Sequence, residues 1–257
     1  MKWRNLFGGA LFAGIFAASC AALAPASLLG WGMGHASGGA LFLADPRGTV
    51  WNGSGVLVLQ NDASIISLGA YEWHARLADL LAAELTFAVR REESERPMLA
   101  SFAPLRNEVR LTGLQLTLPV QVLEMASPQL RPYQFSGEID LQGDELKLSA
   151  RGIEGKVAMR WERAGSGLSD IYPLGTYLLD MAGTGKTLNV RLSTESGSLL
   201  LAGQGQLEQG RGLTFNGTAQ AGPGGQLEQL TEMLHHIGPE TSPGVFALTL
   251  LPQASGG

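Results

Sequence analysis

Cysteine and charge are both scarce in this chain. Cys20 is the only cysteine among 257 residues, so the chain can form no internal disulfide and no zinc site built on cysteine pairs. Charged residues make up 16% of the sequence, and the formal net charge is −5. An acidic chain without a basic stretch is not expected to bind nucleic acid or anionic lipid headgroups.

Motifs that carry chemistry are lacking as well. The sequence has no Gly-x-Ser-x-Gly elbow and no Ser-x-x-Lys pair. Gly183–Thr187 resembles a phosphate-binding loop, but Asp180 stands where that pattern needs glycine, so a polar hairpin turn is expected. His235 and His236 lack the i, i+4 spacing of a helical metal pair. We therefore expect no enzyme activity, no catalytic residue, no metal site and no cofactor.

The N-terminal part is free of charge over a long stretch. Residues 5–44 contain no Asp, Glu, Lys or Arg, and Leu6–Leu29 is mostly apolar. More than twenty such residues suffice to cross a hydrocarbon core of about 30 Å. Lys2 and Arg4 precede the stretch, and Arg47 is the next basic residue. The positive-inside rule then predicts a cytoplasmic N-terminus and export of the remainder.

Two processing sites compete with a retained anchor. Ala17–Cys20 resembles a lipoprotein cleavage box, although Ala17 replaces the usual leucine. Ala22–Ala24 fits a signal-peptidase site, although Pro25 would follow the cut. We therefore expect an uncleaved single-pass transmembrane helix and its exit over residues 1–38, with Pro25 and Gly30–Gly34 marking the exit and Cys20 not acylated.

The exported part, residues 39–257, shows the pattern of a mainly β protein. Apolar and polar residues alternate with period 2, for example over Val157–Glu162 and Leu188–Ser193. Glycine is abundant at 35 residues and marks turns about every ten residues. This combination favours a largely antiparallel, half-buried β-sheet. The expected turns are Gly143-Asp144, Gly165–Gly167, Gly183–Gly185 and Gly222–Gly225.

Helical signals are few. Gln226–Ile237 has apolar residues at helical spacing, and Gly238-Pro239 should end that helix. Val120–Ala126 is expected to form a short helix, and Leu77–Leu85 fits either a helix or a strand. Residues 92–107 are richer in charge and are expected to form an exposed loop.

A loose similarity between the two halves predicts a weak internal repeat, with halves at about 39–130 and 131–257. In each half, glycine-rich turns precede a strand that ends in tryptophan, at Trp73 and at Trp161.

The segment Asp45–Gly55 stands out because it follows the charge-free stretch directly. Gly48-Thr49 predicts a turn, Val50-Trp51 the start of a strand, and Asn52-Gly53 a hairpin-type dipeptide. A large indole beside glycines indicates close backbone packing against a ring, and not chemistry.

An anchor with Pro25 at its exit is followed in order by the motifs Gly48–Gly55, Trp73, Tyr172–Tyr177, Gly197–Gly203 and Leu234–Gly238. This ordered set resembles the type II secretion system protein N family. The resemblance implies a bitopic inner-membrane protein with a periplasmic domain, an accessory role in moving folded proteins across the outer membrane, and other type II secretion components as partners. It supplies no catalytic residues.

That family also resembles AsmA-like proteins, which implies a curved sheet and an alternative function, a lipid- or hydrophobe-binding periplasmic module. An apolar lining made by Trp51, Trp73, Val157, Met159 and Trp161 would favour a ligand groove, whereas packing of the same residues would favour a scaffold. The structural or groove candidates are Trp51, Gly53, Trp73, Trp161, Gly175, Tyr177 and Gly203.

Overall fold

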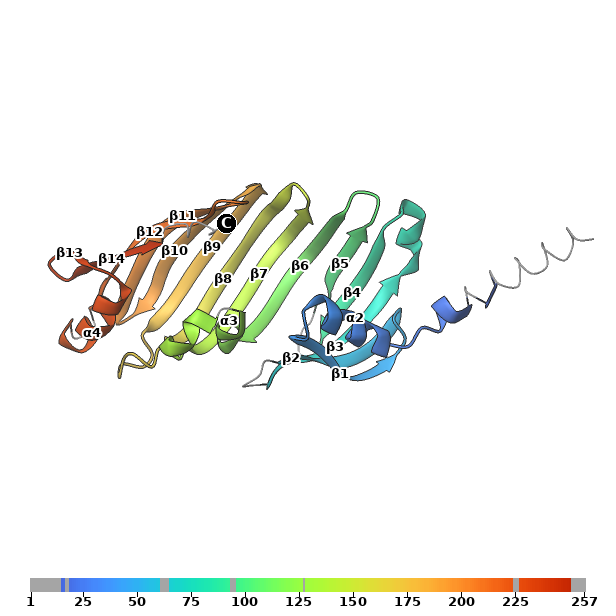
Figure 1. The fold of residues 1–257 in the computed structure, drawn as a ribbon, viewed down its shortest axis with the longest axis horizontal. Helices are drawn as coiled ribbons and strands as arrows, with labels where there is room; N and C mark the ends of the chain where they lie inside the picture. Colours follow the sequence, from blue (N-terminus) through green and yellow to red (C-terminus); the bar gives the residue numbers. More distant parts are fainter. Residues whose placement is uncertain are drawn as a thin grey trace, which may run out of the picture. The chain divides into compact units, whose positions relative to one another are not determined.

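The computed structural model describes residues 15–16, 19–60, 65–92, 96–126, 128–223 and 227–250. By hydrogen-bonding order it holds one 14-stranded sheet, in which β1 to β12 follow chain order and β14 and β13 come last (Figure 1). The pairings within each unit described below are antiparallel. The expected mainly β architecture with few short helices is confirmed.

The chain divides into two compact units. The N-terminal unit comprises residues 1–78 and 87–97, and the C-terminal unit comprises residues 79–86 and 98–257. Elements wholly within the N-terminal unit are α2 (Ser27–Ala36), β1 (Leu41–Gly48), β2 (Asn52–Gln60) and β3 (Ile65–Arg76). Two elements have residues in both units, the 3-10 helix η1 (Leu77–Ala82) and β4 (Leu85–Arg91).

The C-terminal unit holds the longer strands. Its elements are β5 (Met98–Ala103), β6 (Glu108–Pro119), α3 (Gln121–Ala126), η2 (Pro128–Tyr133), β7 (Ser136–Ser149), β8 (Gly152–Gly165), β9 (Gly175–Gly185), β10 (Thr187–Gly197), β11 (Leu199–Glu208), β12 (Gly212–Ala221), α4 (Leu227–Ile237), β13 (Glu240–Ser242) and β14 (Val245–Leu250).

Register divides the sheet of the C-terminal unit into an apolar and a polar side. Leu141 pairs with Met159, Met159 with Leu179, and Leu179 with Leu192, so one apolar row crosses four strands. Successive side chains of a strand point to opposite faces. The residues beside this row, such as Asp180 and Arg191, therefore face the other way.

The amphipathic helix α4 covers part of the apolar side. Leu230, Met233 and Leu234 pack with Leu199, Ala219 and Phe246 in one buried cluster. Figure 1 shows α4 close to β12 and β14. The helix ends at Ile237, where the backbone N–H of Gly238 donates to the Leu234 carbonyl at 3.2 Å, as the Gly238-Pro239 signal predicted.

The N-terminal unit places α2 against β1. A Cβ on Gly30 would lie 3.2 Å from the Leu43 Cβ, which shows how closely the helix approaches the strand. Gly30 and Gly34 lie inside α2, and the expectation that they mark the exit of a spanning helix stays a prediction. The helical chain is interrupted earlier, at Pro25, which forms an isolated β-bridge with Thr49.

No helix in the described ranges is long and apolar enough to cross a membrane. Residues 1–14 and 17–18, which form much of the expected transmembrane helix, lie outside those ranges, as does Ala17 of the proposed lipoprotein box.

Several local expectations need correction. Gly143-Asp144 is not a turn, because β7 runs through it with a register shift against β8 between Gln142 and Leu146. Within 92–107, Met98–Ala103 is strand β5, paired with β6, since apolar residues there continue the sheet. Val50 and Trp51 do not begin a strand; they lie between β1 and β2, and Asn52 and Gly53 belong to β2.

Other expectations are confirmed. The segment Gly183–Thr187 is the hairpin connection between β9 and β10, with Leu188 paired to Gly183. The short helix near Val120 is α3. The ambiguous segment Leu77–Leu85 forms the 3-10 helix η1 and leads into β4.

Shortening a buried side chain of α4 should destabilise the C-terminal unit. Leu234 has 0% exposed surface, and its replacement by Ala should lower the free energy of unfolding by about 2–5 kcal/mol through lost burial and a cavity. Leu207, at 39% exposure, is the matched control, and Leu207→Ala should cost less than about 1 kcal/mol. Urea unfolding of the detergent-solubilised chain, followed by tryptophan fluorescence, measures both; equal losses would contradict the packing of α4.

Candidate functional site

The segment Gly48–Gly53, which we call the clasp, contacts two other parts of the N-terminal unit. On one side it holds the chain before α2, because the Val50 N–H donates to the Ala24 carbonyl at 2.9 Å. On the same side the Trp51 indole Nε1–H donates to the Ala21 carbonyl at 2.7 Å. The clasp therefore joins the end of the N-terminal apolar stretch to the start of the β-sheet.

The other side of the clasp rests on Trp73 of β3. Its indole Nε1–H lies 3.2 Å from the Thr49 carbonyl and 3.1 Å from the Val50 carbonyl, and the side chain is buried. Gly53 leaves room for this ring, because a Cβ there would lie 2.7 Å from Trp73 Cζ2. Trp51 is half-buried, and its carbonyl accepts from the Ala75 N–H at 2.6 Å.

An aromatic cluster lies at the end of β8 and the start of β9 in the C-terminal unit. Trp161 contacts Phe135 edge-to-face at 5.2 Å between ring centroids, and Tyr177 at 5.8 Å. The Trp161 indole donates to the Ser136 carbonyl at 3.0 Å, and the Tyr177 hydroxyl donates to the Leu199 carbonyl at 3.0 Å. Burial raises the pKa of the Tyr177 phenol above its ordinary value. Each polar tip is satisfied, so the cluster is packed structure.

The two remaining candidate glycines also serve packing. Gly175 is buried in β9, and a Cβ there would lie 3.2 Å from the Tyr177 hydroxyl oxygen. Gly203 of β11 lies under the Phe215 ring, because a Cβ there would be 2.6 Å from Phe215 Cζ. The candidates thus fall at two places, Trp51, Gly53 and Trp73 at the clasp and the other four within the C-terminal unit.

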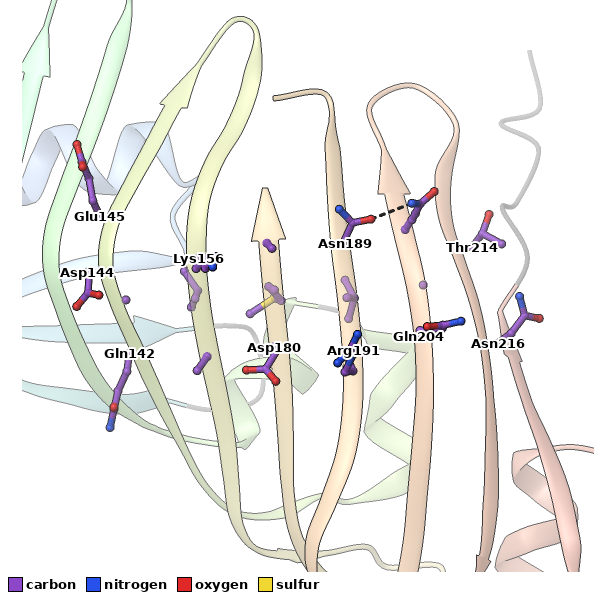
Figure 2. A pocket seen from close by; sticks show the side chains of 18 residues that line it. Gln142, Asp144, Glu145, Lys156, Asp180, Asn189, Arg191, Gln204, Thr214 and Asn216 are labelled. Atoms are coloured by element: carbon purple, nitrogen blue, oxygen red, sulfur yellow. Dashed lines mark hydrogen bonds between the residues drawn. The ribbon is translucent and has the colours of Figure 1, made fainter. Parts of the chain in front are cut away.

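A polar groove runs over the side of the C-terminal sheet opposite the apolar row (Figure 2). It has a volume of 1240 Å³. A single registered row contributes much of its lining, since Asp180 pairs with Arg191, Arg191 with Gln204, and Gln204 with Asn216. The Gln206 amide donates to the Asn189 side-chain oxygen at 2.8 Å beside this row. Such a lining offers both donors and acceptors to a polar surface.

Both polar and apolar residues line the groove, and Val157 is among them. Met159 belongs to the apolar row on the opposite side of the sheet, and Trp161 does not line the groove. Trp161 is packed among aromatic rings instead. A smaller groove of 650 Å³ in the N-terminal unit is bordered by Trp73 together with charged side chains, including Arg47, Glu72 and Arg90.

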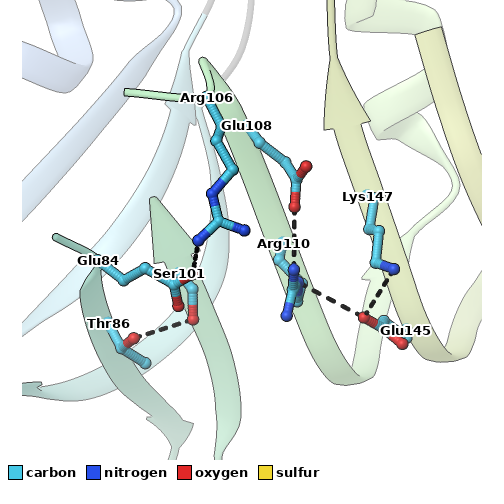
Figure 3. Close-up of polar contacts among 8 residues, drawn as sticks. All are labelled: Glu84, Thr86, Ser101, Arg106, Glu108, Arg110, Glu145 and Lys147. Carbon is cyan, nitrogen blue, oxygen red and sulfur yellow. Dashed lines mark hydrogen bonds and ion pairs between the residues drawn. The ribbon is translucent and has the colours of Figure 1, made fainter. Parts of the chain in front are cut away.

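Charged side chains of the C-terminal unit pair along β6 and along β7, and Arg110 Nε of β6 also lies 3.5 Å from Glu145 Oε1 of β7 (Figure 3). Arg110 Nη2 lies 3.0 Å from Glu108 Oε1, and Lys147 Nζ lies 3.5 Å from Glu145 Oε1. The hydrogen bond from Arg110 lowers the pKa of the Glu108 carboxyl. Arg106 and Glu84 form a further pair at 2.9 Å. Partly exposed pairs like these contribute little stability, and the lowered pKa of Glu108 favours its ionised form, which does not suit a general acid.

Among the residues that the structure describes, no three His, Cys, Asp or Glu side chains come together as a metal-binding group. His235 is stacked edge-on against Phe246 at 5.0 Å, and His236 Nδ1 lies 2.8 Å from the Glu232 carbonyl. Both histidines therefore have local partners at the end of α4.

A family model described as type II secretion system protein N matches residues 39–249. The chain belongs to this family. The match covers most of the β-rich part and confirms the resemblance drawn from the ordered motifs. Comparison with curated proteins and with solved structures gives no match. Members of the protein N family are structural components of the type II secretion system, and the family is not known for enzyme activity.

Sequence reasoning missed two parts of this arrangement. It assigned the clasp a packing role without finding its partner, because Ala21 and Ala24 carry no distinguishing side chain. It also overlooked the polar row across Asp180, Arg191, Gln204 and Asn216. The period-2 pattern placed Arg191 opposite the apolar residues of its own strand, but register alone decides which residues of the other strands are its neighbours.

Adding a methyl group at Gly53 should disrupt the clasp. Gly53→Ala places a Cβ against Trp73 and the Arg47 carbonyl, so we expect a loss of about 1–3 kcal/mol in the free energy of unfolding. Gly32 of α2 is the control, since nothing lies within 4 Å of a Cβ there. Gly32→Ala should leave stability unchanged or raise it by up to about 1 kcal/mol. Denaturant unfolding measures the free energy of unfolding of both variants, and equal changes in the two would refute the close packing at Gly53.

Tyr177 should make stability depend on alkaline pH. Its folded pKa lies above the unfolded value of about 10, so its contribution is complete below that pH and is lost as pH rises toward the folded pKa. Tyr177→Phe should cost about 1 kcal/mol near neutral pH and flatten the alkaline decline. Tyr172, at 62% exposure, is the control. Unfolding curves from neutral to alkaline pH test this; a Tyr177→Phe curve parallel to wild type would contradict it.

Proposed function

We propose that this chain is an accessory structural and interaction component of the type II secretion system, held at the inner membrane by its N-terminal segment with its β-rich part in the periplasm. The family match over residues 39–249 is the observation that carries the proposal. The charge-free stretch over residues 5–44 supports the membrane attachment, with Lys2 and Arg4 as cytoplasmic flanking charges.

The clasp gives this attachment a mechanical consequence. Because Ala21, Ala24 and Pro25 are bonded to Gly48–Trp51, no free linker separates the apolar stretch from the first strands. A domain tethered in this way stays in a shell near the membrane, which raises its effective concentration toward neighbouring components. Contacts with those partners can then be individually weak.

Such contacts would be made by side-chain surfaces more readily than by strand addition. The outermost strands in the hydrogen-bonding order are β1 and β13. β1 carries Asp45, Pro46 and Arg47 with a register shift, and β13 has only 3 residues. Charges, proline, irregular register and short length all discourage edge pairing. The polar groove around Asp180 and Arg191 is the surface that we propose for a secretion partner.

The alternative, a lipid- or hydrophobe-binding module, receives no support from the groove. Its lining is mainly polar side chains from β7 to β12, and the aromatic residues Trp73 and Trp161 are held in packed contacts. The absence of an enzymatic motif in the sequence agrees with a role by binding.

Loss of the protein should impair release of secreted substrates. Deleting its gene should raise the periplasmic share of folded substrate and lower the extracellular share, without changing synthesis or export across the inner membrane. Immunoblots of the two fractions measure the ratio, and complementation with the intact gene is the control. Normal release of every secreted substrate would refute the proposal.

Tethering can be tested separately if the exchanged segment ends before the residues that the clasp binds. The first 18 residues are exchanged for a cleavable signal peptide, so that Ala21 and Ala24 keep their partners in the released protein. We expect the released domain to fold but to support less secretion. An unrelated single-pass anchor in the same place should restore it, and full activity of the released domain would contradict a tethering role.

A further inference from the structure

The helix α2 has one packed side and one apolar exposed side. Gly30 and Gly34, one turn apart, face β1, where a Cβ on either would lie within 4 Å of Leu43 or Phe42. Leu28 and Trp31 lie three residues apart on the other side and are 50% and 72% exposed. Trp31 stacks on His35, one turn further, at 5.7 Å between ring centroids.

The exposed apolar surface continues beyond the helix. Leu23, before the break at Pro25, is 74% exposed. Isolated exposed apolar residues are ordinary, but Leu23, Leu28 and Trp31 follow one another along the chain without an intervening charge. The first charged residue after this surface is Asp45, which pairs with Arg47 at 2.7 Å.

The clasp fixes this surface relative to the sheet of the N-terminal unit. The Ala26 N–H donates to the Gly48 carbonyl at 3.1 Å, immediately before α2 begins at Ser27. The helix has 10 residues, about 15 Å at 1.5 Å per residue, which is half of what a membrane crossing needs. α2 is therefore suited to lie along a surface and not to pass through a bilayer.

We infer that α2 is a membrane-interface helix whose Leu28 and Trp31 side chains enter the lipid boundary. The occupant of this face is the bilayer itself, because the apolar stretch Leu6–Leu29 overlaps the start of α2 and no charged residue lies in either segment. Tryptophan is enriched at such boundaries, where its ring is apolar and its N–H stays near water. The inference rests on the proposed membrane attachment and adds that the clasp, through α2, sets the orientation of the N-terminal unit on the membrane.

Bromine-labelled lipids provide the test. The full chain and its Trp31→Phe variant are placed in phosphatidylcholine nanodiscs, either unlabelled or brominated near the carbonyl end or the methyl end of the acyl chains. The difference between the two chains isolates the emission of Trp31 from that of the other four tryptophans. We expect Trp31 to lose most of its emission with bromine near the carbonyl end and less with bromine near the methyl end.

A second reporter guards against a local effect of the variant. Leu28→Trp in the Trp31→Phe background moves the indole by three residues on the same side of α2 and should be quenched in the same order. Flotation of the full chain with vesicles tests attachment itself. A chain that floats while neither indole is quenched overturns the inference and leaves the attachment standing, which is the result expected if a protein partner or a second copy covers α2. A chain that fails to float overturns both.

Discussion

Backbone register in the antiparallel sheet is the constraint on which the C-terminal unit depends. Once Leu141, Met159, Leu179 and Leu192 stand side by side, their neighbours Ala158, Asp180 and Arg191 must form a row on the opposite side. A shift of one residue would move Asp180 to the side where α4 packs and expose Leu179 to the groove. The same register thus places the buried cluster under α4 and the groove on opposite sides of the sheet.

The helix α4 closes only a part of the apolar side, and it does so through few residues. Leu230 and Leu234 have 0% exposed surface, and Phe246 has 2%. In the apolar row, Leu141, Met159, Leu179 and Leu192 are half-buried, because each is covered mainly by its cross-strand neighbours. A long sheet that buries its apolar side by lateral contacts needs side chains of similar size in adjacent strands, and the Leu and Met residues of the apolar row meet that need.

The N-terminal unit is organised around a different interaction, the hydrogen bonds of the clasp. Trp51 and Trp73 bond opposite sides of it, one toward Ala21 and the other toward Thr49 and Val50. Burial of Trp73 costs little because its N–H keeps a partner. Under the proposed membrane attachment, this arrangement transmits the position of the apolar stretch to the first strands, which a flexible linker would not do.

Sequence alone determined the elements with strong local signals. The helix α4 follows from apolar spacing and Gly238-Pro239, the β9–β10 hairpin from its glycines, and the family from the ordered motifs. Local signals failed where tertiary contacts decide: Gly143-Asp144 has turn chemistry, yet pairing of Gly143 and Glu145 with β6 keeps β7 extended through it. Likewise Val50 and Trp51 favour a strand by composition, but bonds to Ala24 and Ala21 hold them outside one. The groove too was decided by tertiary structure, because its residues come from six strands. The composition of a single strand does not determine its register with strands from distant parts of the chain.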